Sequence, residues 1–326
     1  MPLKDGMTML MFSSDFTTTP EFTGSIPTRL EVTSPRTARG NLVGVIDALV
    51  IGASGMVGGQ LLQIGQQRGL SVAGTYLSFA MPDLHFLDAS DDAAVQNLVS
   101  LLKPRVIFLP AAFTNVDACE RDPSLSQRIN VTAMENVARA CQRTGAKLVS
   151  FSSDYVFDGL NGPYDEDAAP NPVNVYGQHK LEAEQIAAAV GALVLRTNGV
   201  YGPEIQGKNF VLRLVQGLRA GQTWRIPVDQ FGNPTLASDL ALAAWDAIEL
   251  SGIYHAAGHH FCDRYSFALE IARVFKLNAA QLEAVDTPSL GQAALRPLRG
   301  GLVSLRLEHA LGWGFHGLEG LGTLLE

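Results

Sequence analysis

The chain has 326 residues and a formal net charge of −8, with 47% hydrophobic, 17% charged and 8% aromatic residues. This composition is typical of a globular enzyme and excludes a disordered or fibrous chain, while an acidic balance without a Lys/Arg block argues against a nucleic-acid partner. Three widely spaced cysteines, and no apolar run near the roughly 20 residues that span a bilayer, predict a protein of the reducing cytoplasm without a membrane segment.

The expected elements follow one another in a regular alternation. Residues 1–44 are rich in Ser, Thr and Pro, and we interpret them as a flexible N-terminal extension. Short apolar runs, typical of buried strands, follow at residues 44–51, 71–74, 105–111, 147–152 and 192–195. Helical periodicity separates them, as at residues 123–143 and 176–190. The alternation predicts an α/β fold, with a Rossmann-type doubly wound parallel sheet at residues 45–200 and a smaller, mainly substrate-binding C-terminal lobe at residues 201–326.

The glycine turn after the first strand carries the first functional signal. Gly52, Gly55 and Gly58 leave room for backbone N–H groups to approach a pyrophosphate at a helix N-terminus, and Ser54 adds a hydroxyl donor. Glycines also gather in turns for conformational reasons alone. The position of this turn between a strand and a helix nevertheless favours a dinucleotide cofactor.

The second strand bears on the choice of cofactor. Residues 74–78 contain Thr75 and Ser78 but no carboxylate to hold a ribose 2′-hydroxyl. Hydroxyl groups tolerate a 2′-phosphate better than a carboxylate does, so we expect NADPH, with NADH as the alternative, and Thr75 as a cofactor-binding residue. Asp88, which follows the next apolar run, either hydrogen-bonds the adenine amine or caps the next helix.

A tyrosine and a lysine four residues apart suggest the chemistry. Tyr176 and Lys180 leave the same face of a predicted helix, and a cation near a phenol brings its ordinary pKa of about 10 toward the working range. Such pairs also occur by chance on protein surfaces. Ser153, at the end of a predicted central strand, adds a hydroxyl at the ligand crevice, although turns also favour serine. Together these residues predict a proton-donating triad behind a nucleotide-binding fold.

The sequence resembles the extended short-chain dehydrogenases over about residues 46–324, and among them most closely the dTDP-4-dehydrorhamnose reductases. The most specific of its motifs is Asp-Gln-Phe-Gly-Asn-Pro-Thr at residues 229–235. Further motifs that carry the resemblance lie at residues 52–58, 111–117, 152–159, 174–177, 196–197, 252–255 and 296–297. The resemblance implies reduction of a 4-keto group on a nucleotide-linked deoxysugar, as in dTDP-L-rhamnose biosynthesis, and it allows a homodimer.

The resemblance also implies roles for single residues. Ser153 replaces the family's usual threonine and polarises the keto oxygen, with Tyr176 as the acid and Lys180 beside the ribose. The cofactor is lined by Gly55, Met56, Val57, Asp88, Ala111, Ala112 and Phe113. The substrate is contacted by Asn115, Val116, Asp154, Tyr155, Gln230 and Arg296. Gly199 stands where the family carries a tryptophan against the sugar, which predicts a wider pocket.

Other functions fit the sequence less well. Related dehydratases need an Asp-Glu pair after the catalytic hydroxyl, whereas Tyr155 follows Asp154 here, and epimerases share the triad but carry a different loop after the strand. The family also includes the regulatory subunit of methionine adenosyltransferase, a non-catalytic binding protein. An intact triad favours an enzyme over such a scaffold.

One group of residues raises the question of a metal. Imidazole and thiolate groups bind zinc when four ligands converge, and a short segment offers His255, His259, His260 and Cys262. No matching pair of ligands stands elsewhere in the sequence. We therefore expect incidental histidines in a strand-end loop and no metal site.

Overall fold

The computed structural model describes residues 45–325, so the predicted N-terminal extension at residues 1–44 lies outside the described part of the chain. Within residues 45–325 no helix is both long and apolar enough to cross a membrane.

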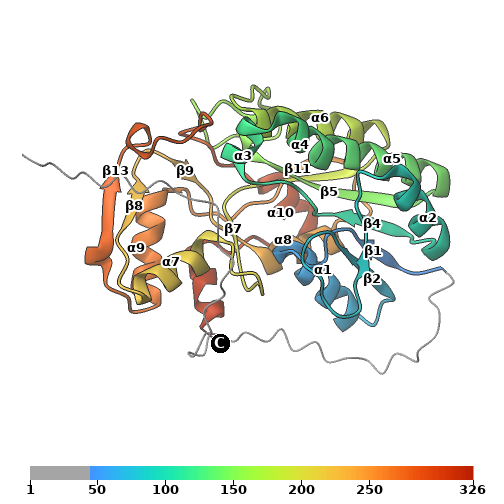
Figure 1. The fold of residues 1–326 in the computed structure, drawn as a ribbon, viewed down its shortest axis with the longest axis horizontal. Helices are drawn as coiled ribbons and strands as arrows, with labels where there is room; N and C mark the ends of the chain where they lie inside the picture. The colour runs from blue at the N-terminus through green and yellow to red at the C-terminus, as the bar shows by residue number, and fades with distance from the viewer. Residues whose placement is uncertain (1–44, 326) are drawn as a thin grey trace, which may run out of the picture.

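A parallel sheet of seven strands forms the centre of the molecule, in the order β11-β6-β5-β4-β1-β2-β3 (Figure 1). Its strands are β1 (Ala48–Val50), β2 (Val72–Tyr76), β3 (His85–Phe86), β4 (Val106–Leu109), β5 (Lys147–Ser153), β6 (Leu193–Thr197) and β11 (Gly252–His255). Every residue of β1 and β4 is buried, because helices cover both faces of the sheet. The order β3-β2-β1-β4-β5-β6 is that of a Rossmann fold, which confirms the predicted fold class.

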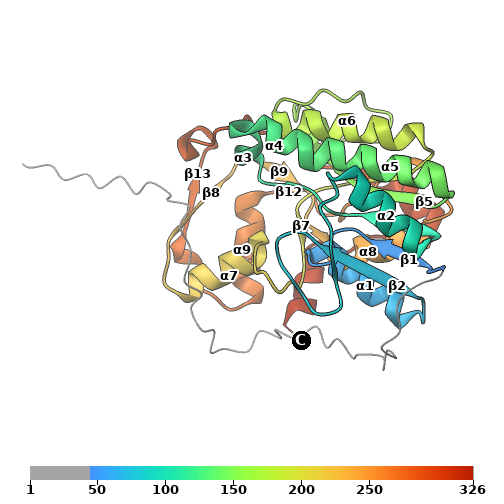
Figure 2. The same ribbon diagram turned by 45° about the vertical axis from the view of Figure 1, so that its right-hand side comes forward.

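Two helical layers bury this sheet (Figure 2). One layer consists of α2 (Asp92–Leu102), α5 (Ala133–Thr144) and α6 (Val175–Ala189), whose apolar side chains Val95, Val137 and Ala183 pack on the sheet. The opposite layer consists of α1 (Met56–Gln67), α8 (Ala237–Asp246) and α10 (Leu305–Leu311). Elements that follow residue 201 in the chain, namely α8, β11 and α10, therefore complete the Rossmann architecture.

The predicted helix at residues 123–143 is divided into three pieces. Its first turn is α4 (Pro123–Gln127), a π-helical segment covers Arg128–Thr132, and α5 follows. The wider turn places buried Asn130 against the loop after β4, where its side chain accepts a hydrogen bond from the Phe113 N–H at 2.8 Å and donates one to the Phe113 carbonyl at 3.1 Å. Helical periodicity gave no sign of this local widening.

A second group of elements, which we call the lobe, lies beside the sheet (Figure 1). It contains α7 (Phe210–Arg219), α9 (Arg264–Val274) and the parallel strands β8 (Trp224–Pro227) and β13 (Leu282–Val285), which share one apolar core. Short strand pairs lie near it: β7 (Val200–Tyr201) with β10 (Thr235–Leu236), and β9 (Phe231–Gly232) with β12 (Cys262–Asp263).

Candidate functional site

The carboxyl end of β5 presents Ser153, the hydroxyl of the predicted triad. The strand ends there and a 3-10 helix, Asp154–Val156, begins, with the Ser153 Oγ accepting a hydrogen bond from the Tyr155 N–H at 3.2 Å. The same hydroxyl donates to the Asp154 carboxylate at 3.1 Å. Because ligands of open parallel sheets bind at the carboxyl ends of the strands, Ser153 stands at the expected edge of the sheet.

Helix α6 carries Tyr176 and Lys180 to the same place. Its N-cap, Asn174, accepts a hydrogen bond from the Gly177 N–H at 2.8 Å and donates to the Leu295 carbonyl at 2.8 Å. Gly177 permits the close approach, since a β-carbon at this position would stand 2.1 Å from the Tyr155 carbonyl oxygen. The first turn of α6 therefore packs directly on the 3-10 helix after β5, and the Tyr155 and Tyr176 rings meet edge to face, with centroids 5.6 Å apart.

Burial controls the protonation of both side chains. It raises the pKa of the Tyr176 phenol, while the adjacent Ser153 hydroxyl acts in the opposite direction. Burial lowers the pKa of Lys180 to about 8, against the attraction of Glu184, and the Lys180 Nζ donates to the Phe151 carbonyl at 2.6 Å. A phenol that keeps its proton thus lies one turn from an amine that is mostly cationic at neutral pH.

A buried ion pair lies behind the lysine, and the sequence analysis did not find it. Arg196 of β6 donates two hydrogen bonds to Glu184 of α6, at 2.9 and 2.7 Å, and both side chains are at most 3% exposed. The Arg196 guanidinium also lies 5.0 Å from the Phe157 ring centroid. The spacing of Lys180 and Glu184 by four residues was the available signal for a charge network along this face of α6.

Asp154 connects the triad to a distant part of the chain. Its carboxylate accepts hydrogen bonds from the Gly301 N–H at 3.1 Å and from the Asn198 amide, and its side chain is 2% exposed. Burial raises the pKa of Asp154 to about 6. The resemblance assigns Asp154 to the sugar, but in this structure its carboxylate is hydrogen-bonded to Ser153, to Asn198 and to the backbone N–H of Gly301.

The glycine turn fits a pyrophosphate. Gly55 is the N-cap of α1 and adds no side chain to the helix N-terminus, and a β-carbon at Gly58 would stand 2.2 Å from the Gly52 carbonyl oxygen. Thr75 is buried and accepts a hydrogen bond from the Gly52 N–H at 3.2 Å, which holds the turn against β2. A small recess opens here, lined by Ala53, Ser54, Gly55, Met56, Gly59, Met81, Pro203, Glu204 and Ile205. The bare helix N-terminus and the tight turn match the donor set that a dinucleotide requires.

Among the other predicted cofactor residues, Ala111 lies directly against this turn. Ala111 follows β4, and its β-carbon would lie 2.9 Å from a β-carbon built at Gly52. Asp88 accepts hydrogen bonds from the Ser90 N–H at 2.9 Å and the Ser90 hydroxyl at 2.6 Å, and that hydroxyl is the main reason for its lowered pKa. The alternative that Asp88 caps the next helix is wrong, because Asp91 accepts the capping hydrogen bond from Ala94.

Besides Asp154 and Tyr155 at the triad, the predicted substrate residues occupy two further places. Exposed Asn115 caps the short helix α3 (Val116–Arg121), and Arg296 pairs with Asp117 of this helix at 2.9 Å. Gln230 lies at the lobe and donates to the Thr287 hydroxyl at 3.0 Å and the Gln292 amide oxygen at 2.9 Å. Gly199 is exposed and has a positive φ of 54°, a backbone conformation that disfavours a large side chain.

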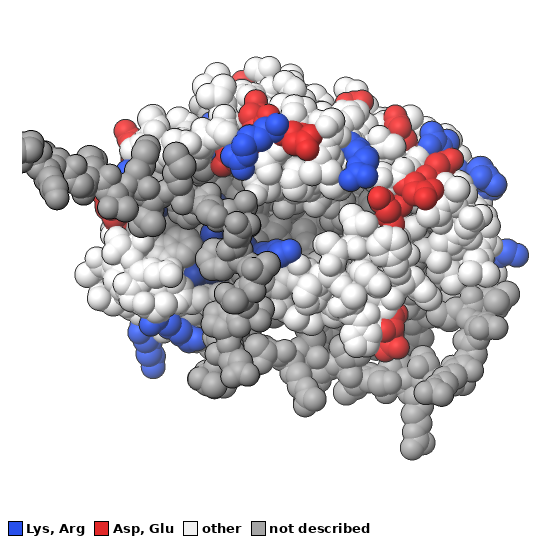
Figure 3. Space-filling view, viewed as in Figure 1, with Lys and Arg blue, Asp and Glu red and all other residues white. Residues whose placement is uncertain are grey.

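A hollow separates the sheet from the lobe on the face shown in Figure 3, and basic side chains reach it. Arg264, the first residue of α9, was not foreseen from the sequence. Together with Arg296 it acts on the half-buried Tyr155, and both cations oppose the burial that raises the pKa of this phenol. The arrangement places two guanidinium groups near the triad, where a phosphate-bearing substrate would gain from them.

Comparisons with known proteins agree with this geometry. The family model described as the RmlD substrate binding domain matches residues 46–316. Methionine adenosyltransferase 2 subunit beta of Xenopus laevis is 33% identical over 272 residues, 80% of this chain and 81% of its own. The dTDP-4-dehydrorhamnose reductase of Streptomyces griseus is 35% identical over 260 residues, 76% of this chain and 83% of its own. The solved structure of dTDP-4-dehydrorhamnose reductase from Bacillus anthracis in complex with NADP superimposes with a TM-score of 0.79 at 29% identity, covering 86% of this chain and 99% of that one.

Proposed function

The chain belongs to the RmlD substrate binding domain family, and on this premise we propose that it reduces the 4-keto group of a nucleotide-linked deoxysugar, as dTDP-4-dehydrorhamnose reductases do. The reductant is NADPH, with NADH as the alternative. One observation carries the proposal: Ser153, Tyr176 and Lys180 come together at the carboxyl end of β5. The NADP named for the solved Bacillus anthracis reductase supports the class of cofactor.

The buried triad explains how a proton reaches the keto oxygen. A bound nicotinamide supplies the hydride to the keto carbon. Ser153 turns its hydroxyl from Asp154 to the keto oxygen and polarises the carbonyl, and Tyr176 holds its proton until that oxygen becomes basic enough to take it. The resulting phenolate lies near the cationic Lys180, which offsets its charge in a site that excludes water.

We assign the cofactor to the glycine turn and its surroundings. Residues 45–200 supply most of this site, with Pro203, Glu204 and Ile205 at its edge, and the later residues supply the substrate lobe together with α8, β11 and α10 of the Rossmann part. In this assignment the N-terminus of α1 faces the pyrophosphate, Ala111, Ala112 and Phe113 line the nicotinamide half, and Lys180 holds the ribose. The absence of a carboxylate from residues 74–78 supports NADPH over NADH.

An absorbance assay tests the reductase function. The purified protein is mixed with NADPH or NADH and with dTDP-4-keto-6-deoxy-L-mannose, prepared with the enzymes of the preceding steps. We expect oxidation that depends on the sugar and is faster with NADPH. Because we expect glycine at position 199 to leave a wider pocket than the family's tryptophan, other nucleotide-linked 4-ketosugars are included. If the cofactor binds and none of these sugars is reduced, the proposal is wrong.

The relation to methionine adenosyltransferase 2 subunit beta supports a second candidate, a non-catalytic regulatory subunit that binds NAD(P). This function predicts cofactor binding without turnover and a stable complex with a methionine adenosyltransferase catalytic subunit. Size-exclusion chromatography of the two proteins distinguishes the candidates. The intact triad favours the reductase, since a scaffold would be free to lose Ser153, Tyr176 and Lys180.

A further inference from the structure

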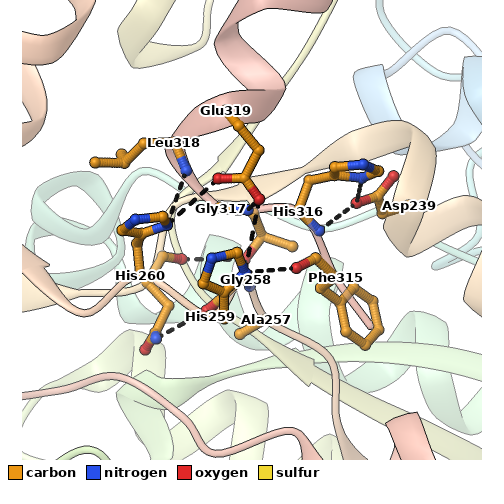
Figure 4. Close-up of polar contacts among 12 residues, drawn as sticks. Asp239, Ala257, Gly258, His259, His260, Phe315, His316, Gly317, Leu318 and Glu319 are labelled. Atoms are coloured by element: carbon orange, nitrogen blue, oxygen red, sulfur yellow. Dashed lines mark hydrogen bonds and ion pairs between the residues drawn. The ribbon is translucent and has the colours of Figure 1, made fainter. Parts of the chain in front are cut away.

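Two adjacent histidines and a glutamate meet on the surface, outside the triad and the glycine turn. His259 and His260 follow β11, and Glu319 belongs to the 3-10 helix Leu318–Leu324 near the end of the chain. One potential ligand atom from each residue lies within 4.8 Å of the other two, and residues 45–325 contain no second group of this kind. Figure 4 shows the three side chains turned toward one another.

The distance between His260 and Glu319 is close to that of a metal centre, whereas the His259 Nδ1 atom lies 3.7 Å from the Glu319 Oε1 atom. The Nδ1 atom of His260 lies 3.4 Å from the Oε2 atom of Glu319. A tetrahedral zinc ion with bonds of roughly 2.0–2.1 Å holds its ligand atoms about 3.3 Å apart. The side chains of all three residues are 44–55% exposed, so the surface leaves room for the His259 ring to turn its Nε2 atom toward the ion, and for water to complete the coordination.

Hydrogen bonds with the backbone orient the group. The His259 Nδ1 atom lies 3.0 Å from the Phe315 carbonyl oxygen, a contact in which the ring donates a proton and leaves the lone pair on Nε2. Glu319 accepts a hydrogen bond from the Gly317 N–H at 2.9 Å. Second bonds of this kind fix the tautomer and direction of metal ligands, so the contacts of His259 and Glu319 can remain when an ion binds. The Leu318 N–H donates to the His260 Nδ1 atom at 3.3 Å, and a cation at that atom would replace this contact.

We propose that His259, His260 and Glu319 bind a first-row transition metal cation, for which Zn²⁺ is the probe. Imidazole and carboxylate ligands suit zinc and its neighbours, whereas Mg²⁺ and Ca²⁺ prefer oxygen ligands throughout. Three protein ligands with an open position are a known form of zinc coordination. Glu270 of α9 is engaged by Arg273 at 2.6 and 2.8 Å and does not join the group.

Of the four potential metal ligands that the sequence analysis considered, the structure brings His259 and His260 into this group and leaves His255 and Cys262 out. His255 is fully buried, its Nδ1 atom lies 3.1 Å from the Tyr164 carbonyl oxygen, and burial lowers its pKa to about 3. Cys262 is the first residue of β12, and its sulfur is not among the ligand atoms that come together with His259 and His260. The third ligand is instead Glu319. Its contact with the two histidines joins segments about 60 residues apart, and no sequence pattern predicts it.

Such an ion would connect the loop after β11 to the C-terminal segment. The two already pack closely, since a β-carbon at Gly317 would stand 2.2 Å from the His260 Nδ1 atom. Tyr201 of β7 donates to the Gly317 carbonyl at 2.6 Å. A bound cation would therefore hold the last residues of the chain against β7, independently of whether the chain is a reductase.

Titration calorimetry of the full chain without an affinity tag tests the site. We expect one Zn²⁺ per chain and no measurable Mg²⁺ binding. His260→Ala and Glu319→Gln each remove a direct ligand, so each should weaken zinc binding by more than the about tenfold typical of outer contacts. His309→Ala is the matched control, because His309 is an exposed histidine of α10 and lies outside the group.

Thermal unfolding supplies a second measurement. Zinc should raise the Tm of the wild type and of His309→Ala, and should leave the Tm of a His259→Ala/His260→Ala double variant unchanged. The proposal is overturned if the wild type binds no zinc. It is equally overturned if zinc binds His260→Ala and Glu319→Gln as tightly as it binds the wild type, since the ion would then sit elsewhere.

Discussion

The hydroxyl of Tyr176 is the proton source in the proposed reduction. Tyr176→Phe removes this proton and little volume, so turnover should fall by about 10²- to 10⁴-fold while the Kd for NADPH stays unchanged. The measurements are kcat by absorbance and Kd by cofactor fluorescence. Tyr254→Phe is the control, because Tyr254 lies on β11 at the far edge of the sheet from β3 and loses the same hydroxyl. Normal turnover by Tyr176→Phe would show that another group supplies the proton.

Asp154 makes stability depend on pH. Its folded pKa of about 6 exceeds the ordinary value of 3.8, so its contribution to stability is fully present below pH 3.8 and is lost as the pH rises through about 6. Two units of pKa correspond to roughly 3 kcal/mol. Asp154→Asn removes the buried charge, and we expect the unfolding free energy of the wild type, relative to the variant, to decrease between pH 4 and pH 7.

Urea denaturation over this pH range measures the difference. Asp158→Asn serves as the control, because Asp158 has a lowered pKa, caused chiefly by the Tyr164 hydroxyl, and its contribution has the opposite sign. It is present above the ordinary pKa and lost as the pH falls. A stability difference between wild type and Asp154→Asn that does not vary with pH would contradict a buried, titrating Asp154.

Among the elements, the contact between α6 and the 3-10 helix after β5 decides whether the triad assembles. Gly177→Ala would place a methyl group 2.1 Å from the Tyr155 carbonyl oxygen, which forces the two elements apart. We expect a loss of about 1–3 kcal/mol in unfolding free energy and a lower kcat. Gly59→Ala on α1 is the control, since its methyl group finds only the Ala53 oxygen at 3.7 Å and helical alanine is favoured. Equal unfolding free energies of the two variants would mean that α6 and the 3-10 helix after β5 can accommodate the extra methyl group, so that their contact is not the close one described.

The sequence predicted the elements well because each carries a local pattern. The buried apolar run at residues 105–111 forms β4, and the helical period that begins at Tyr176 forms α6. The same patterns placed Ser153 at a strand end and Tyr176 with Lys180 on one face of a helix. The π-helical turn at Asn130 was missed, because its cause is a hydrogen bond to Phe113, 17 residues away in sequence.

At the site too, the contacts between segments that are distant in the sequence could not be predicted. The hydrogen bond from Gly301 to Asp154 joins residues 147 positions apart, and the Arg196–Glu184 pair needs β6 and α6 side by side. No local period encodes such pairings. The resemblance to dTDP-4-dehydrorhamnose reductases, confirmed by relatives at 33–35% identity, supplied the overall fold and the family, while these pairings came only from the structure.

Across the whole molecule, the segment at residues 294–301 connects β9 to the end of β5: the Phe231 N–H donates to the Leu298 carbonyl at 2.7 Å, and the Gly301 N–H donates to the Asp154 carboxylate at 3.1 Å. Its Arg296 pairs with Asp117 at 2.9 Å, and the Asp117 carboxylate also accepts the Ala294 N–H at 3.0 Å. Asp117→Asn keeps the shape and removes the charge that holds the guanidinium, whose side chain is only 8% exposed. We expect KM for the nucleotide-linked sugar to change several-fold and kcat to change little, because Tyr176 and Lys180 are not touched.

Separate measurement of kcat and KM distinguishes this role from a general loss of stability. Asp167→Asn is the matched control: Asp167 pairs with Arg306 at 2.9 Å on the surface, where an ion pair contributes about 0–1 kcal/mol, and it should alter neither constant. Were Asp117→Asn to lower kcat at constant KM, Arg296 would act on the reacting groups and not on substrate placement. An unchanged KM and kcat would show that Arg296 holds its position without Asp117, and that the segment is fixed by its other contacts, such as the hydrogen bond from Asn174 to the Leu295 carbonyl.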